Sequence, residues 1–387
     1  MKRYLNSTVV NMPPSGIRRF FDLVSTMKDV ISLGVGEPDF VTPWTIREGG
    51  IFSLEDGQTM YTSNAGLFEL RRELARYMRN HLGLEYNPNG EILITVGASE
   101  AVDLAMRALL EPGDVVLVPD PSYVSYAPCA ALAGADVRYV PTWESQNFRM
   151  RVKDLQAVYT PKAKVLVLSY PNNPTGAIMT KDDLLPIAKF AEEHDLIVIS
   201  DEIYSDLTYR GTHTPFASLP GMHNRTLHLS GFSKAYAMTG WRIGYVAGHP
   251  EIIQAMTKIH QYTILCAPIT AQYAALEALN SAEAAKKEMV ETYDMRRRLM
   301  VNGFRQMGLS CFEPLGAFYV FPNISPTGLS SEEFCEELLN EEKVAVVPGS
   351  VFGPSGEGHV RCSYAYSTEQ LQGALERIAR FVARRVS

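Results

Sequence analysis

Val165-Leu-Val-Leu168 and Leu196-Ile-Val-Ile199 are two continuous apolar runs that decide the fold. Such runs are typical of strands that are buried on both faces of a parallel sheet. The segment between them, Asp182 to His194, repeats its apolar residues at helical spacing. The order strand, helix, strand predicts a mostly parallel sheet with helices on both sides.

The same alternation continues outward from these two runs. Before them we expect strands at Glu91–Val96 and Val115–Pro119, with a helix between them that ends near Leu110. After them, Thr226–Leu229 and Ile243–Val246 are further apolar runs of strand length. We therefore expect one large α/β domain over residues 41–281.

The two ends of the chain differ from this middle part. Residues 282–307 are charged and helical in pattern, and we interpret Arg296-Arg-Arg298 as a solvated helix face. Short strands are expected at Ala317–Phe321, Val344–Val347 and Val360–Ser363. We join residues 1–40 with residues 282–387 into a smaller, discontinuous α/β domain.

Composition limits the class of function. The net charge of −7 gives no basic footprint for nucleic acid. The five cysteines are scattered without a C-x-x-C pair, which favours a reducing compartment, and we expect a cytoplasmic protein. We expect no signal peptide in residues 1–10, and no apolar run approaches the ~20 residues of a membrane span.

The strongest chemical signal is a lysine just past a strand. Lys234 follows the run at residues 226–229 in a turn of small residues, and Arg242 comes eight positions later. A lysine in such surroundings can have a lowered pKa and attack an aldehyde as a neutral amine. Taken alone, however, the segment favours an ordinary surface lysine.

Five more loops and strands carry residues of chemical interest. Gly97-Ala-Ser99 opens a helix, where backbone N–H groups favour phosphate, although a plain helix cap is the simpler interpretation. Tyr123 could stack on a planar ring or pack on the surface. Asn173 lies in the restricted loop Pro171–Gly176 and could donate a hydrogen bond.

The remaining candidates are charged groups at buried positions. Asp201 ends a buried strand and needs a partner, either a pyridinium N–H or a nearby backbone amide. Arg361 lies inside a short apolar strand, where its planar fork suits a carboxylate, with an internal ion pair as the alternative. Together the five segments offer the groups that pyridoxal 5′-phosphate and an α-amino acid require.

The chain resembles the class I/II aminotransferases of fold type I, in the aspartate and aromatic aminotransferase branch. The resemblance runs nearly end to end. It rests on Leu33–Phe40, Tyr61–Gly66 with Glu69–Arg71, Asn172–Gly176, Ser200–Tyr204, Ser233–Lys234, Gly240–Gly244, Gly316–Tyr319 and Val347–Ser350. It implies a seven-stranded type of sheet sandwiched by helices in the large domain, a homodimer and a role in amino-acid metabolism.

The resemblance also implies roles for individual residues. Lys234 is the Schiff-base lysine and proton shuttle of a ping-pong transaminase, Asp201 pairs with the pyridinium nitrogen, and Asn173 and Tyr204 bind the phenolic oxygen. Tyr123 stacks on the ring. Phosphate would be held by Gly97, Ala98, Ser99, Ser233 and Arg242, with Tyr61 reaching the neighbouring subunit's site. Arg361 binds the α-carboxylate beside the Gly36 backbone and Asn173.

Some alternatives stay open. Gly231 stands where some relatives carry a phosphate-binding serine, so either Ser230 or Ser233 could take that role. Arg18 or Arg19 could bind a distal carboxylate, whereas Phe20, Phe21 and Tyr262 suit an aromatic side chain. We expect glutamate with 2-oxoglutarate as one substrate pair and an aromatic or aspartate-like acid as the other.

Two other functions are considered. A β-lyase acting on sulfur amino acids would use the same fold and cofactor residues. A regulatory domain that senses pyridoxal phosphate would need a DNA-binding module, for which the segment before Gly34 is too short and too neutral. We expect no metal site, because the neighbouring His213, His223 and His228 lack a second cluster of ligands.

Overall fold

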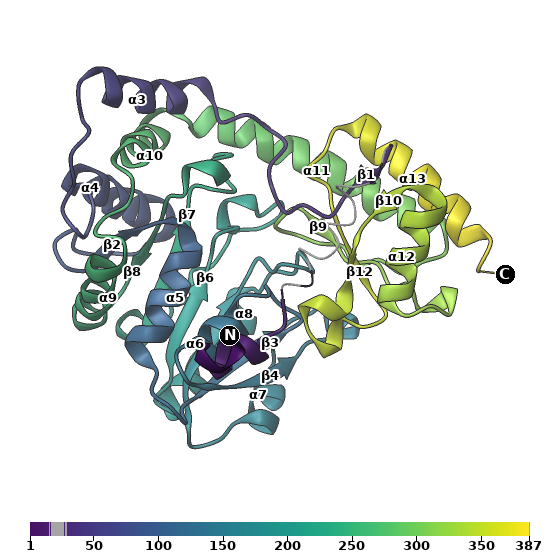
Figure 1. The fold of residues 1–387 in the computed structure, drawn as a ribbon, viewed down its shortest axis with the longest axis horizontal. Coiled ribbons are helices and arrows are strands. Elements are labelled where there is room, and N and C mark those ends of the chain that lie inside the picture. The colour runs from purple at the N-terminus through teal and green to yellow at the C-terminus, as the bar shows by residue number, and fades with distance from the viewer. Residues whose placement is uncertain (15, 17–26, 28, 387) are drawn as a thin grey trace.

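Figure 1 shows the computed structural model of the chain, which describes residues 1–14, 16, 27 and 29–386. A seven-stranded sheet forms the centre, in the order β2-β8-β7-β6-β5-β3-β4. Its strands are β2 (Ile92–Thr95), β3 (Val115–Asp120), β4 (Asp136–Pro141), β5 (Ala163–Ser169), β6 (Ile197–Asp201), β7 (Thr226–Gly231) and β8 (Gly244–Ala247). All neighbours are parallel except β8, which is antiparallel to both β2 and β7. The mostly parallel sheet predicted from the sequence is confirmed.

Helices cover both faces of this sheet. They are α3 (Trp44–Glu55), α4 (Phe68–Tyr77), α5 (Gly97–Leu109), α6 (Tyr126–Leu132), α7 (Val152–Val158), α8 (Lys181–Glu193), α9 (Pro250–Thr263) and α10 (Ile269–Ser281). Along β5, Val165 and Val167 pack with α5, α6 and α9, whereas Leu166 and Leu168 pack with α7 and α8. This burial of alternate side chains on opposite faces explains the continuous apolar run.

The rest of the chain forms smaller sheets with long helices. The helices are α11 (Glu283–Gln306), α12 (Ser331–Glu342) and α13 (Thr368–Ala383). One sheet has the order β11-β12-β9, from β11 (Val347–Pro348), β12 (Val360–Ser363) and β9 (Tyr319–Val320). A second pairs β1 (Ile31–Ser32) with β10 (Val344–Ala345) in parallel. The single strand expected over residues 344–347 is thus divided, because its two halves pair with different sheets.

The N-terminal segment has contacts with both parts of the molecule. The short helix α1 (Ser7–Asn11) lies against α6 of the large sheet, whereas β1 belongs to the smaller part (Figure 1). The proposed boundaries, 41–281 for the large domain and 1–40 with 282–387 for the small one, stay a prediction. Among the described residues, no helix is both long and apolar enough to cross a membrane.

The arginine run on α11 differs from its predicted role. Arg296 and Arg297 are buried, and only Arg298 of the three is exposed. Arg296 pairs with Asp39 at 2.8 Å, and Arg297 pairs with Glu313 at 2.8 Å. The prediction of a solvated face was wrong for these two side chains. Arg297 also pairs with Asp294 on α11, but Asp39 and Glu313 lie in other segments that the helical pattern does not reveal.

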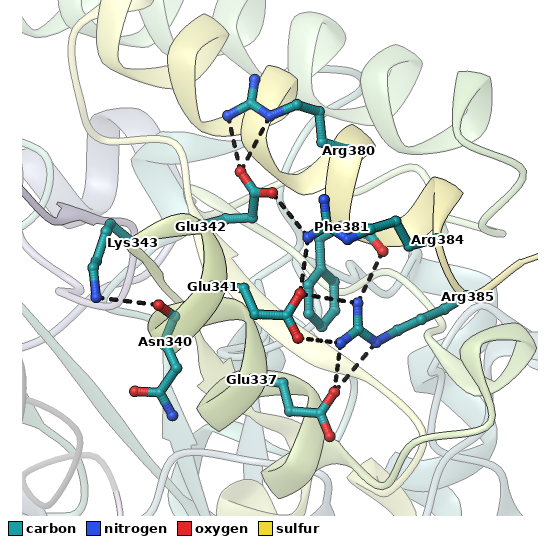
Figure 2. Close-up of polar contacts among 9 residues, drawn as sticks. All are labelled: Glu337, Asn340, Glu341, Glu342, Lys343, Arg380, Phe381, Arg384 and Arg385. Atoms are coloured by element: carbon teal, nitrogen blue, oxygen red, sulfur yellow. Dashed lines mark hydrogen bonds and ion pairs between the residues drawn. The ribbon is translucent and has the colours of Figure 1, made fainter.

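Helices α12 and α13 are joined at the surface by a ladder of ion pairs (Figure 2). Glu342 pairs with Arg380 at 2.8 Å, and Glu341 pairs with Arg384 at 2.8 Å. Arg385 reaches Glu337 at 2.7 Å and also contacts Glu341. The ladder therefore neutralises its arginines with carboxylates.

Candidate active site

A cavity of about 840 Å³ lies at the carboxyl edge of the large sheet, where the loops after β3, β5, β6 and β7 meet the N-terminus of α5 and segments of the smaller part. Carboxyl ends of parallel strands commonly form ligand sites. Eleven of the candidate residues line it, namely Gly36, Ala98, Ser99, Tyr123, Asn173, Asp201, Tyr204, Ser233, Lys234, Arg242 and Arg361. The fold therefore brings together groups that are up to several hundred positions apart in sequence.

Lys234 stands three residues beyond β7, and its amine faces the cavity. The Nζ atom donates a hydrogen bond of 2.6 Å to the Gly36 carbonyl oxygen. Burial lowers the pKa of Lys234 to about 8, an effect that Glu37 opposes and that Arg361 and Arg242 reinforce. Near neutral pH the neutral, nucleophilic form of the amine is therefore much more populated than in an ordinary lysine.

Asp201 ends β6 with its carboxylate buried at the cavity wall. The Tyr126 hydroxyl donates to its Oδ2 at 2.7 Å, and the Ile203 N–H donates to its Oδ1 at 3.2 Å. Burial raises the pKa of Asp201, and these two donors oppose the rise. The carboxylate is thus oriented toward a partner that can carry a positive charge. Tyr126 was missed from the sequence, where it is one more tyrosine near the start of a helix.

Arg361 on β12 extends toward the cavity from the smaller part. Its Nη1 donates to Asn173 Oδ1 at 2.9 Å, and its Nη2 donates to the Gly34 carbonyl oxygen at 2.5 Å. The guanidinium lies 4.5 Å from the ring centre of Tyr319. None of the described carboxylates forms an ion pair with it, so these contacts orient the charge without neutralising it. The internal ion pair considered from the sequence does not form within the described residues.

The N-terminus of α5 lies beside Arg242 at the cavity. Gly97 has a positive φ of 77°, and a Cβ there would collide with the Arg242 guanidinium. Ala98 and Ser99 line the cavity beside it, although Gly97 itself does not. Ser233 also lines the cavity, whereas Ser230 is buried and donates to the Glu202 backbone oxygen at 3.3 Å. This geometry favours Ser233 over Ser230 as a phosphate ligand.

Two tyrosines meet between Asp201 and Arg361. The hydroxyls of Tyr204 and Tyr319 are 2.8 Å apart, and both rings are buried. The pKa of Tyr204 is raised well above its usual value, mainly by burial and to a smaller extent by the nearby Tyr319. The Tyr204 hydroxyl therefore keeps its proton and remains a donor. A Cβ at Gly36 would collide with the Tyr319 hydroxyl, which explains the glycine. The sequence pointed to the segment 316–319 but not to Tyr319 as part of the site.

Several candidates lie elsewhere. The exposed fraction of Tyr61 is 81%, and that of Tyr262 is 83%; neither lines the cavity. Arg18, Arg19, Phe20 and Phe21 lie outside the described residues. His213 and His228 both face the buried carboxylate of Glu202, at 2.5 and 3.4 Å. Within the described ranges, no group of three or more His, Cys, Asp or Glu side chains could hold a metal ion.

Comparison with known proteins agrees with this geometry. Residues 28–378 match the family described as aminotransferase class I and II. The chain is a class I and II aminotransferase. The aminotransferase is 48% identical to the aspartate aminotransferase of Pyrococcus abyssi, over 94% of this chain and 95% of that protein. It is 45% identical to aromatic-amino-acid aminotransferase 2 of Thermococcus litoralis, over 94% and 95% of the two chains.

Solved structures place this aminotransferase in fold type I. The structure of aspartate aminotransferase from Thermus thermophilus with maleate superposes with a TM-score of 0.93, at 39% identity, over 97% of this chain and 99% of that one. Aminotransferases of the aspartate and aromatic branch use pyridoxal 5′-phosphate as their cofactor.

The residues of the cavity fit this cofactor. The α5 N-terminus, Ser233 and Arg242 would hold its phosphate. Asp201 is an oriented, buried carboxylate that would suit a ring nitrogen. Lys234 would supply the amine for the aldehyde carbon, and Tyr204 and Asn173 would supply polar groups for the ring oxygen. Arg361 would remain for a substrate carboxylate.

Proposed function

We propose that this enzyme moves the amino group of an L-amino acid to a 2-oxo acid by a ping-pong mechanism, with Lys234 as the Schiff-base lysine and proton shuttle. The supporting observation is the arrangement of three cations in one cavity. Lys234 has a pKa lowered to about 8, and it shares the cavity with Arg242, which would hold a phosphate, and Arg361, which would bind a carboxylate. One cavity can therefore serve both half-reactions, since the amino acid and the oxo acid share a carboxylate.

Each residue then has a distinct task. When bound, pyridoxal phosphate supplies the aldehyde carbon and a ring that accepts electrons. Asp201 keeps a positive charge on the ring nitrogen, and Tyr126 keeps the Asp201 carboxylate in position. Arg361, held by Asn173 and Gly34, would bind and orient the α-carboxylate near Lys234. The neutral Lys234 amine would accept the Cα proton and hold it for return.

The experiment is the visible absorption spectrum of the purified protein, before and after adding L-glutamate without any oxo acid. We expect a coloured form that bleaches with glutamate and returns with 2-oxoglutarate. A colourless protein that stays so after incubation with pyridoxal phosphate would contradict the proposal. Release of pyruvate and ammonia from cystathionine, without an acceptor, would instead assign the enzyme to the β-lyases.

We propose glutamate with 2-oxoglutarate as one substrate pair and an aromatic or aspartate-like acid as the other. The described lining includes four tyrosines, Tyr123, Tyr126, Tyr204 and Tyr319, which can pack against an aromatic side chain. Two relatives are named for aspartate and aromatic amino acids, in agreement with this choice. The kcat/KM values for a panel of donors test it, and turnover of branched-chain acids alone would refute it.

We also propose a homodimer in which Tyr61 reaches the neighbouring subunit's active site. Tyr61 and Met60 are both 81% exposed, and other exposed apolar side chains come from Val41, α3 and the end of α9. Asn64 donates to the Leu265 carbonyl at 2.8 Å, so the Tyr61 segment lies beside the end of α9. Many exposed apolar side chains of this kind are typical of an interface, and a second copy would cover them.

Mixing two defective variants tests this shared site. Lys234→Ala and Tyr61→Ala proteins are each expected to transfer amino groups poorly. Unfolded and refolded together, they would form mixed dimers in which one site combines an intact Lys234 with an intact Tyr61. Activity that rises above the sum of the separate proteins supports the proposal. Mixed dimers, verified by differently tagged chains, that show no rise would overturn it.

A further inference from the structure

One segment crosses the cavity and carries two of its backbone contacts. We call residues 33–42 the strap; it joins β1 to the start of α3 (Figure 1). The Gly34 carbonyl accepts from Arg361, and the Gly36 carbonyl accepts from Lys234. Glu37 accepts from the Thr239 hydroxyl in the loop that follows Lys234. The position of the strap therefore determines how the amine and the guanidinium are held.

Both ends of the strap are anchored by hydrogen bonds. At the first end, the Leu33 N–H donates to the Ala345 carbonyl at 2.8 Å. At the other, the Thr42 hydroxyl donates to the Ala237 carbonyl at 2.5 Å and accepts from the Trp241 indole N–H at 3.0 Å. The first anchor belongs to the smaller part of the molecule and the second to the large sheet. The strap consequently spans the two parts.

Helix α11 is a second connection between the same parts, and it contacts the strap at its middle. Arg296 on α11 pairs with Asp39 at 2.8 Å. The same guanidinium lies 5.4 Å from the Phe40 ring centre, and Phe40 packs edge-on against Tyr293 at 5.4 Å. The exposed fraction of the Arg296 side chain is only 10%, so the pair is largely shielded from water. The Arg296–Asp39 ion pair and the Phe40–Tyr293 ring contact thus tie the strap to α11.

We propose that Arg296 is a positioning residue for the substrate site, which acts through Asp39 to keep the strap over the cavity. With the pair intact, the Gly34 and Gly36 carbonyls stay in reach of Arg361 and Lys234. Without it, the strap still has its two anchored ends, the Val35 N–H bond to the Tyr366 hydroxyl, and the contacts of Glu37 and Phe40. It loses its charged attachment to α11, and we expect the two carbonyls to leave their partners for part of the time. Of the two tests below, only the kinetic one rests on the proposed amino-group transfer.

The chain offers a matched control on the same helix. Arg298 also pairs with an aspartate, Asp294, at 2.5 Å, but its side chain is 57% exposed and its partner is on α11 itself. Arg296→Gln and Arg298→Gln therefore remove the same charge from one helix, and only the first releases the strap. Arg296→Lys keeps the charge and can restore a single bond to Asp39.

Two measurements on the holoenzyme test the proposal. If the strap is in place about a tenth of the time, the KM for both acids rises about tenfold in Arg296→Gln, with kcat changed much less. Arg298→Gln should match the wild type, and Arg296→Lys should recover most of the loss. Amide hydrogen exchange of a peptide covering residues 33–42 should become faster in Arg296→Gln alone, while exchange in β5 and β6 stays unchanged.

The outcomes separate this inference from the proposed function. The inference is overturned if Arg296→Gln behaves as Arg298→Gln does in both KM and strap exchange. It is also overturned if exchange rises throughout the molecule, because Arg296 would then only stabilise the fold. In the double variant Arg296→Gln/Asp39→Asn, the increase in KM should be no larger than in either single variant. Increases that add would contradict the pairing. If the wild type transfers no amino group at all, the proposed function fails and the exchange measurement still decides the role of Arg296.

Discussion

The cavity and the α12–α13 ladder each gather three cationic side chains, but they hold them in opposite ways. In the ladder, Arg380, Arg384 and Arg385 are paired with glutamates (Figure 2). In the cavity, the hydrogen bonds of Lys234, Arg242 and Arg361 go to carbonyl or amide oxygens, and none has a carboxylate ion-pair partner among the described residues. Neutral oxygens orient a cation and leave its charge available for a ligand, whereas carboxylates neutralise it.

Removing the cavity amine should have the largest effect. We expect Lys234→Ala to lower the rate of amino-group transfer by about 10³-fold or more, because the proton carrier is lost. Lys343→Ala, at the edge of the ladder, is the control, since its amine contacts only the Asn340 carbonyl among the described residues. Steady-state rates with glutamate measure both. If the Lys234→Ala protein transferred amino groups at the wild-type rate, the cavity amine would matter no more for catalysis than the lysine beside the ladder.

Removing the Arg361 guanidinium from the cavity should have the second-largest effect on activity. In Arg361→Gln we expect kcat/KM for carboxylate substrates to fall by about a hundredfold, as when a buried charged partner is truncated. Cofactor uptake, followed by absorbance, should stay close to that of the wild type because the residues proposed to hold the phosphate, Ser99, Ser233 and Arg242, are all intact. Arg380→Gln, in the ladder, should leave kcat/KM unchanged. Equal losses in the two variants would show that neither charge is reserved for substrate.

The lowered pKa of Lys234 gives a pH dependence with a definite sign. Below pH 8 most of the amine is protonated, so the rate at which the cofactor-free protein captures pyridoxal phosphate should rise with pH and reach half its maximum near pH 8. Glu37 raises this pKa, so Glu37→Gln should move the half-maximum to lower pH. Borohydride trapping followed by mass spectrometry measures the capture. A shift to higher pH would mean that Glu37 does not act on the amine through its charge.

Breaking the ladder should have the smallest effect. Arg384 and its partner Glu341 are well exposed, with side-chain exposures of 47% and 39%. We expect Arg384→Gln to lower the melting temperature by less than about 2 °C, because exposed pairs are screened by water and salt. In 1 M salt the difference should disappear. A larger loss that persists in high salt would indicate that the ladder stabilises the fold in a way that the cavity cations do not.

The sequence predicts those features that depend on local pattern. The runs at residues 165–168 and 196–199 identify β5 and β6 because both of their faces are buried. Residues 344–347 appear as one strand in the sequence, since nothing local reveals that β10 pairs with β1 and β11 with β12. Arg296 was misjudged for the same reason, because Asp39 lies far from it in the sequence.

The residues of the candidate site also divide into those that local pattern reveals and those that depend on distant partners. Lys234, Asp201 and Arg361 are recognisable because a charged residue at or beside an apolar strand needs a partner. Tyr126 and Tyr319 act through neighbours, the Asp201 carboxylate and the Tyr204 hydroxyl, which come from other loops. Their roles depend on tertiary distances that no spacing encodes. The role of Tyr61 stays a prediction, since it concerns a second copy of the chain.

The antiparallel strand β8 has a consequence for how two different acids can share one enzyme. Because Gly231 pairs with Gly244, the segment carrying Lys234 and Arg242 is a loop closed at the edge of the large sheet. Arg361 instead belongs to the three-stranded sheet. Any shift between the sheets changes the distance from Arg361 to the amine but keeps the amine and Arg242 together. In the proposed mechanism, this arrangement would let the first acid leave and the second enter while the cofactor stays bound.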